Sequence, residues 1–307
     1  MAAGSRAEEP APNGADGSDE AAGAGVTDLP RRPGPVTRVR ARRFEPGSTG
    51  VPREDQLATE EPLEVRVGSR RVAVTMRTPG ADFELAVGWL LSEGLLSGHG
   101  DVSAVRYCTD VELEPDERFN VVTVDLADPT ADDGASGTRP FLVSSACGVC
   151  GRETLDDLHL RGYHRAPEGS LLDPAWLASL PDRLGERQSV FERTGGLHAA
   201  GLFEAGGQEP LVVREDVGRH NAVDKVVGWA LLGDRLPLHG HVLVVSGRAS
   251  YELCQKAVGA GVDALVAVSA PSSLAVRVAK EFGLTLAAFA RAGRVTVYAG
   301  EERVAGS

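Results

Sequence analysis

The second half of the chain alternates short apolar runs with amphipathic stretches, and this alternation limits its fold more than any other feature. The apolar runs at residues 241–245 (HVLVV) and 264–268 (ALVAV) are followed by helical patterns at 251–260 and 272–282. Strands that are apolar on both sides and separated by helices are typical of a parallel sheet covered on both faces. We therefore expect an α/β fold with a mixed, largely parallel sheet between layers of helices.

Further segments complete this expected fold. Between residues 139 and 307 we expect helices at 174–193 and 222–232 and strands at 197–203, 211–214, 284–289 and 295–298. Before residue 139 the pattern is that of a smaller α+β unit. There we expect strands at 63–67, 71–76, 105–113 and 119–126, and a helix from its cap Asp82 to Glu93. Gly68 and Ser69, between the first two strands, suit a two-residue hairpin turn.

The first 35 residues are predicted to form a disordered tail. Residues 1–25 contain no Val, Ile, Leu, Phe, Trp or Tyr, so they cannot bury enough apolar surface to offset the entropy lost on ordering. A polar, glycine-containing stretch at 130–138 is interpreted as a linker. The chain is thus divided into a tail (1–35), an N-terminal α+β subdomain (36–138) and an α/β core (139–307).

A group of arginines at the end of the tail is interpreted as a solvated leader into the first strand or, alternatively, as a docking segment. It comprises Arg31, Arg32, Arg38, Arg40, Arg42 and Arg43.

The charge of the chain excludes some functions. There are 32 Lys+Arg and 44 Asp+Glu residues, a net charge of −12, whereas a general nucleic-acid binder needs a basic surface. The longest uncharged stretch, residues 264–276, is shorter than the roughly 20 residues of a membrane span, and the N-terminus lacks the apolar core of a signal peptide. Four cysteines cannot form a disulfide scaffold in a chain of this length. We expect a cytoplasmic protein with reduced thiols that binds neither nucleic acid nor membranes.

The sharpest chemical feature is a CxxC pair, Cys147 and Cys150, in the segment SSACGVCG, which Arg152 follows. Half of a zinc site would need a second pair of ligands, and the other cysteines, Cys108 and Cys254, are isolated. A thioredoxin-like redox pair should open a helix after a strand, and the residues that follow show only a weak helical pattern. A third reading is a nucleophilic or sulfur-carrying thiol, because small neighbours leave the sulfur accessible and Arg152 favours the thiolate. The motif indicates a reactive thiol and leaves the reaction open.

Three expected strand ends carry residues suited to phosphate. In open α/β sheets, ligands bind beyond the carboxyl ends of the strands, where helix N-termini offer free N–H groups. The loop after the expected strand 241–245 contains Ser246, Arg248 and Ser250. The loop after strand 264–268 contains Ser272, and the loop after strand 284–289 contains Arg291 and Arg294. Neither GxxxxGK[ST] nor GxGxxG occurs, which excludes a P-loop or a simple dinucleotide fold. We expect an anion site here, although ordinary caps and turns would explain each loop taken alone.

A dense polar cluster, REDVGRHN at residues 214–221, precedes Asp224 and Lys225. It is either a capped helix start, with Asn221 as the cap, or a polar network at the same edge of the sheet. His198 lies inside an apolar strand pattern, which is more typical of a hydrogen-bonded core histidine than of a catalyst.

These motifs together resemble the FdhD family, the formate dehydrogenase accessory sulfurtransferases. The resemblance covers roughly residues 36–300 and rests on SSACGVCG, REDVGRHNAVDKVVG, VSGRASYELCQKA and APSSLAVRVAKEFGLTLAAFARAGR, with TPGADFELAVGWLLSEGLL and FNVVTVDL in the N-terminal part. It implies a homodimer with a cytidine-deaminase-like, three-layer core. The HxE…PCxxC zinc signature of the deaminases is missing, so we expect no bound zinc and no deamination.

The resemblance also implies a function for the cysteine pair. Family members accept sulfane sulfur from a cysteine desulfurase as a persulfide and pass it to the molybdenum or tungsten centre of a bis(molybdopterin guanine dinucleotide) cofactor, which formate dehydrogenase requires. Cys147 corresponds to the persulfide carrier and Cys150 to its partner. The family's cofactor contact corresponds to Phe289, Ala290, Arg291, Ala292, Gly293 and Arg294. A thiol–disulfide oxidoreductase and a non-catalytic cofactor chaperone are the alternatives.

Overall fold

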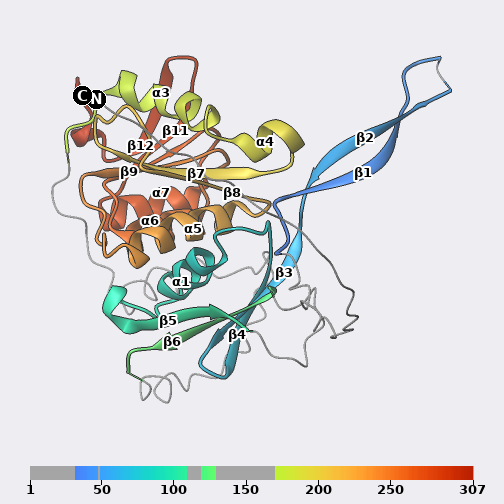
Figure 1. The fold of residues 1–307 in the computed structure, drawn as a ribbon. Helices are drawn as coiled ribbons and strands as arrows, with labels where there is room; N and C mark the ends of the chain where they lie inside the picture. The colour runs from blue at the N-terminus through green and yellow to red at the C-terminus, as the bar shows by residue number, and fades with distance from the viewer. Residues whose placement is uncertain (1–31, 48, 109–118, 129–169, 307) are drawn as a thin grey trace, which may run out of the picture. The chain divides into compact units, whose positions relative to one another are not determined.

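The computed structural model describes residues 32–47, 49–108, 119–128 and 170–306 (Figure 1). The predicted linker at 130–138, the cysteine pair Cys147 and Cys150, and Arg152 lie outside the described residues, as does the predicted boundary between residues 138 and 139. No helix in the described part of the chain is long and apolar enough to span a membrane.

The larger sheet has six strands in the order β12-β11-β10-β9-β7-β8. Its strands are β7 (His198–Glu204), β8 (Val212–Asp216), β9 (His241–Val245), β10 (Ala264–Ala267), β11 (Thr285–Arg291) and β12 (Arg294–Ala299). The central strands β9, β10 and β11 are parallel, as predicted, but β7, β8 and β12 are antiparallel to their neighbours. The sheet is therefore mixed but not largely parallel. The prediction failed because β7–β8 and β11–β12 are joined by short turns, and only antiparallel strands can be connected so tightly.

Helices cover both faces of this sheet, as expected (Figure 1). On one face lie α5 (Arg219–Leu232), α6 (Tyr251–Ala260) and α7 (Ser273–Phe282), and on the other lies α3 (Pro174–Gly185). Because side chains alternate along a strand, β9 divides its apolar residues between the two faces. Leu243 packs with the helices α5 to α7, and Val242 and Val244 pack with α3.

Two predicted helices have different bounds in the structure. The segment 174–193 is not one helix, because α3 ends at Gly185 and α4 (Ser189–Thr194) begins after a break. Helix α5 begins at Arg219 instead of residue 222, and its N-cap is Gly218, not Asn221. The amide of Asn221 donates to the backbone oxygen of Met76 and to Asp216, so it joins two segments instead of capping the helix.

The smaller sheet has four strands in the order β4-β3-β6-β5. These are β3 (Glu61–Val67), β4 (Arg70–Arg77), β5 (Val102–Tyr107) and β6 (Val121–Leu126). The predicted hairpin is confirmed, since Val67 pairs with Arg70 across Gly68, which has φ +55°. Helix α1 (Asp82–Ser92) follows, with Ala81 at the N-cap and Asp82 as its first residue instead of its cap. Two short 3₁₀ helices, η1 (His99–Asp101) and η3 (Glu301–Arg303), complete the described helical segments.

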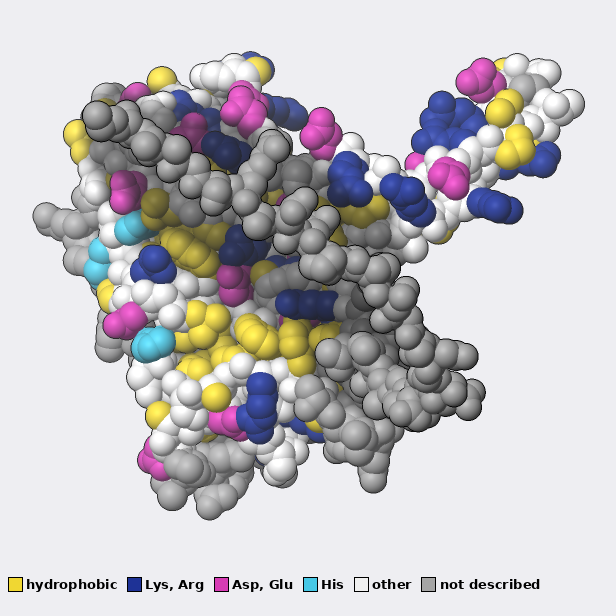
Figure 2. All heavy atoms as spheres, in the orientation of Figure 1, with side chains coloured by type: hydrophobic (Ala, Val, Ile, Leu, Met, Phe, Trp, Pro, Cys, Tyr) yellow, Lys and Arg dark blue, Asp and Glu magenta, His cyan; other side chains and the backbone are white. Residues whose placement is uncertain are grey.

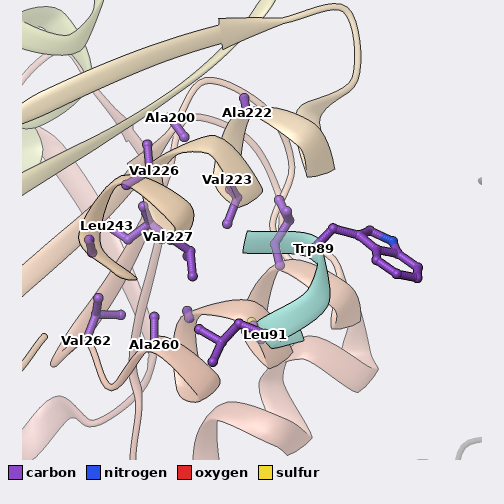
Figure 3. Close-up of a cluster of buried hydrophobic side chains, with 14 of the residues drawn as sticks. Trp89, Leu91, Ala200, Ala222, Val223, Val226, Val227, Leu243, Ala260 and Val262 are labelled. Carbon is purple, nitrogen blue, oxygen red and sulfur yellow. The ribbon is translucent and has the colours of Figure 1, made fainter. Parts of the chain in front are cut away.

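Helix α1 packs against α5 and joins the two sheets in one hydrophobic cluster. Leu63 of β3 and Val122 of β6 belong to the same buried cluster as Val226 of α5 and Leu243 of β9. Figure 3 shows Leu91 of α1 on the side of Ala260 of α6, with the indole of Trp89 pointing away from the other labelled side chains. The backbones approach closely, because a Cβ on Gly88 would lie 2.9 Å from the backbone nitrogen of Gly228.

A two-stranded sheet that the sequence did not reveal precedes these elements. Strands β1 (Val36–Arg43) and β2 (Val51–Ala58) pair antiparallel with each other, and Figure 2 shows basic side chains spread along them. Residues 32–35 of the predicted tail are among the described residues. The guanidinium of Arg32 lies 4.8 Å from the ring centroid of Tyr107, and the backbone oxygen of Pro35 accepts from Thr59, so residues 32–35 contact the folded chain.

Candidate functional site

The three predicted phosphate loops lie side by side, because they follow the parallel strands β9, β10 and β11. The backbone nitrogen of Ser269 donates to the oxygen of Gly247 over 3.3 Å, and that of Phe289 donates to the oxygen of Ser269 over 3.4 Å. The backbone nitrogen of Ser272 likewise donates to the backbone oxygen of Ala249 over 2.9 Å. The structure therefore brings together the three strand ends that the sequence analysis grouped at one sheet edge.

The serines of these loops have structural partners. Ser250 and Ser272 are the N-caps of α6 and α7, and their hydroxyls accept from the backbone nitrogens of Leu253 and Ala275. The hydroxyl of Ser246 accepts from the backbone nitrogen of Ala199 over 2.9 Å. Each hydroxyl thus supports the fold at this edge, whereas the side chain of Arg248 is exposed.

The turn between β11 and β12 presents two arginines. Ala292 and Gly293 have φ +51° and +71°, so both central residues adopt the left-handed conformation of a tight hairpin turn. Arg291 and Arg294 are paired directly across this turn, and both are exposed. Like charges placed opposite each other destabilise a hairpin, so an anion between them would remove a local repulsion. Within the same segment, Ala290 is buried and Phe289 is 37 % exposed.

A cavity of about 500 Å³ adjoins the loop after β9. A Cβ on Gly247 would lie 3.6 Å from Nδ1 of His198 and 3.7 Å from Cδ of Arg219, and Nε2 of His220 lies 3.4 Å from the hydroxyl of Ser250. The charged and aromatic residues of its lining are Glu60, Trp89, Glu93, His198, Arg219, His220, Asp224, Glu252 and Lys256. His198 is thus half-buried at a cavity wall and is not a core histidine. The polar cluster at 214–221 thus lies at the sheet edge where the sequence analysis considered it. The cavity itself could not be predicted, because its lining includes Trp89 from a distant segment.

The cluster at 214–221 and the residues after it divide into structural and cavity-facing parts. The buried carboxylate of Asp216 accepts from the backbone nitrogens of Thr78 and Gly218 and lies 2.7 Å from Nζ of Lys225. Asp224 is likewise buried and pairs with Lys256 over 2.6 Å. Buried charges of this kind must be paired, so these residues fix the start of α5 against α1 and β4. Arg219 and His220 line the cavity without taking part in these pairs.

Electrostatic effects within the cavity are consistent with this division. Burial lowers the pKa of His198, and the nearby positive charges of Arg219 and His220 lower it further. The hydrogen bond from His220 lowers the pKa of Glu252, whereas burial raises the pKa of Asp224 despite its contact with Lys256. At neutral pH, His198 is therefore neutral.

Of the two described thiols, Cys254 differs from a reactive cysteine. Cys254 is fully buried in α6, and burial raises the pKa of its thiol to about 12. Cys108 follows β5 and is partly buried. Among the described residues, no group of three or more His, Cys, Asp or Glu side chains could hold a metal ion. The absence of zinc stays a prediction, because Cys147 and Cys150 are not among those residues.

These features define a class of α/β protein whose candidate ligand site lies beyond the carboxyl ends of parallel central strands. Comparison with known proteins specifies the family. The chain belongs to the FdhD/NarQ family, whose model matches residues 58–305.

Relatives and a solved structure agree with this assignment. The chain is 50% identical over 255 residues to the sulfur carrier protein FdhD of Mycolicibacterium paratuberculosis, which covers 83% of this chain and 93% of the relative. It is also 50% identical over 272 residues to the protein of the same name from Nocardia farcinica, covering 88% and 95% of the two chains. A crystal structure from Desulfotalea psychrophila, solved as a candidate formate dehydrogenase accessory protein, matches with a TM-score of 0.68 and 23% identity over 88% of this chain and 99% of that one. At this identity, the structural match establishes the fold.

Proposed function

We propose that the chain is a sulfur carrier that serves formate dehydrogenase. It accepts persulfide sulfur from a cysteine desulfurase on Cys147 and passes it to the bis(molybdopterin guanine dinucleotide) cofactor. The observation that carries the proposal is the identity of 50% to sulfur carrier proteins over more than four-fifths of the chain. The cytidine-deaminase-like arrangement, the homodimer and the cytoplasmic location belong to the same proposal.

Sulfur uptake follows from thiolate chemistry. The Cys147 thiolate attacks the outer sulfur of the desulfurase persulfide, a new S–S bond forms at Cys147, and the donor's S–S bond breaks. The electron pair of that bond leaves with the donor cysteine as its thiolate, so no external oxidant or reductant is needed. Arg152 and the small residues around Cys147 support this step, since a positive charge favours the thiolate and small neighbours leave the sulfur accessible.

The strand-end loops are the proposed cofactor site. Its residues are Ser246, Arg248, Ser250, Ser272, Phe289, Ala290, Arg291, Ala292, Gly293 and Arg294. Support comes from the contact between the loops and from the two exposed arginines across the β11–β12 turn, because guanidinium groups bind diphosphates with charge-assisted hydrogen bonds. The cofactor is a substrate here, and no zinc takes part.

Mass spectrometry after incubation with a desulfurase and cysteine tests the function. We expect Cys147 to gain the mass of one sulfur atom. Cys254 is the internal control, because its buried thiol has a raised pKa and should remain unmodified. If Cys147 and Cys150 only ever form a disulfide, the chain is a thiol–disulfide oxidoreductase and the proposal is wrong.

Replacement of Arg294 by alanine is expected to weaken the binding of GDP, which represents the guanine-nucleotide end of the cofactor. A charge-assisted hydrogen bond contributes about 1.5–3 kcal/mol, so the dissociation constant should rise roughly 10- to 150-fold. Arg248→Ala should have a smaller effect, since Ser246 and Ser250 remain. Titration calorimetry measures both, with Arg277→Ala, an exposed arginine on α7, as the control for lost charge. Unchanged affinity in both site variants would place the cofactor elsewhere.

A further inference from the structure

The ribbon formed by β1 and β2 carries a row of arginines along one of its faces. Because side chains alternate along a strand, Arg38, Arg40 and Arg42 lie on the same face of β1, and all three are exposed. None of them has an ion pair or a hydrogen bond with another described residue. Neighbouring members of the row are about 7 Å apart along the strand, less than the screening length of about 8 Å at physiological ionic strength, so their charges repel each other.

The rest of this face leaves the row with a net positive charge. The register of the ribbon opposes the three arginines with a single carboxylate, that of Glu54. At the base of the ribbon, Arg193 of α4 donates to the side chain of Gln56 over 3.0 Å and adds a further positive charge. The ion pair of Arg53 with Asp55 lies on the opposite face of the ribbon, so it does not neutralise the row. The face is therefore suited to an acidic partner.

Strand β1 also has a free edge. In the described part of the chain, the ribbon is a sheet of two strands, and β1 pairs with β2 alone. The backbone N–H and C=O groups along the other edge of β1 thus have no described strand to bond. An extended peptide can add to such an edge as a further strand. Every second side chain of the added strand would then lie on the face that carries the arginine row, where opposite charges stabilise the pairing.

The distribution of charge favours a protein segment over a nucleic acid. The chain as a whole has a net charge of −12, whereas residues 36–58 contain five arginines and three acidic residues. A long polyanion such as a nucleic acid would also meet the acidic remainder of the chain and be repelled by it. A short acidic segment needs to contact the ribbon alone.

We infer that the ribbon docks an extended, acidic segment of a partner protein. Carboxylates at alternate positions of this segment pair with Arg38, Arg40 and Arg42, and its backbone adds to the free edge of β1. The inference goes beyond the proposed function and does not depend on it. The family model begins at residue 58, the last residue of β2, and every residue that the proposed function uses follows residue 146.

Fluorescence anisotropy with a labelled heptapeptide of alternating glutamate and threonine tests the inference. The wild-type protein should bind this peptide, and more weakly as the salt concentration rises. Combining Arg38→Gln, Arg40→Gln and Arg42→Gln should raise the dissociation constant roughly tenfold, because loss of an exposed ion pair typically costs a factor of about two or three. A peptide of the same composition with its glutamates grouped together should bind more weakly than the alternating peptide, since its carboxylates would fall on both faces of the added strand.

Arg43→Gln is the matched control, because Arg43 is exposed on the opposite face of the same strand, where it is paired with Val51. It should weaken binding less than Arg40→Gln, the single variant to use if the triple variant does not fold. Equal affinity in the wild type, Arg40→Gln and the triple variant would overturn the inference, as would a wild-type protein that does not bind the alternating peptide. Tighter binding of a short oligothymidine than of the peptide would overturn it in favour of a nucleic-acid site. A change from dimer to monomer in the triple variant, measured by sedimentation, would instead make the ribbon an interface between two copies of this chain.

Discussion

Gly228→Ala is expected to lower the free energy of unfolding by about 3 kcal/mol or more, a large part of the roughly 5–15 kcal/mol that stabilises a typical protein. A Cβ on Gly228 would meet the backbone of Glu84 well within the 3.0 Å that real Cβ atoms keep. Backbone atoms cannot rotate away as a side chain can, so α1 and α5 would have to separate. Gly88→Ala should have a similar effect, because its Cβ would meet the backbone of Asp224.

Urea denaturation followed by circular dichroism measures this loss. The control is Gly185→Ala at the end of α3, where a Cβ would meet no atom within 4 Å. Because alanine restricts the unfolded chain more than glycine does, this control should be neutral or stabilising by up to about 1 kcal/mol. A Gly228→Ala protein as stable as the control would show that the two helices are not packed this closely.

Cys147→Ala is expected to reduce formate dehydrogenase activity to that of cells without this protein. The variant has no sulfur atom at position 147 to carry a persulfide, and the thiol of Cys254 cannot substitute, since it is buried with a raised pKa. Activity of formate dehydrogenase in cells that produce only the variant measures the effect.

Cys150→Ala should have an equal or milder effect, and Cys254→Ala should leave activity unchanged. Both variants need a check of their expression level and melting temperature. Full activity with Cys147→Ala would show that the protein acts as a cofactor chaperone and not as a sulfur carrier. A persulfide found on Cys150 alone would reverse the proposed roles of the two cysteines.

The elements that local pattern determines were predicted well. The bounds of β9 and α6 agree with prediction, and α7 starts one residue later because Ser272 is its cap. The predictions were wrong where tertiary contacts determine the local structure. Asn221 is a typical cap residue, yet its side chain bonds to Met76 and Asp216, and that contact depends on a strand far away in the sequence. The pair β1–β2 escaped prediction because its residues show no clear division between a buried and an exposed face.

Part of the candidate site could also be predicted from the local pattern of strands and helices. Parallel strands bring their carboxyl ends to one edge, so the loops that contain Ser246, Ser272 and Arg294 could be grouped from sequence alone. The sequence could not show which residues of 214–225 form buried structural contacts and which line the cavity without such pairs. Lys225 and Asp224 are charged residues on a helix, and only the structure shows that both are buried in ion pairs while Arg219 faces a cavity.

The cavity has walls from distant parts of the chain, with Trp89 from α1, Met76 from β4 and Arg219 from α5. Any molecule that binds in it must therefore bind more tightly when α1 and α5 are in contact than when they are apart. By mass action, such a molecule shifts the equilibrium toward the joined form by RT ln(1 + [L]/Kd), about 2.7 kcal/mol at a concentration of 100 Kd. Ligand occupancy and the cohesion of the two sheets are thus thermodynamically linked, and protection of the α1 backbone from hydrogen exchange should increase as the cavity fills.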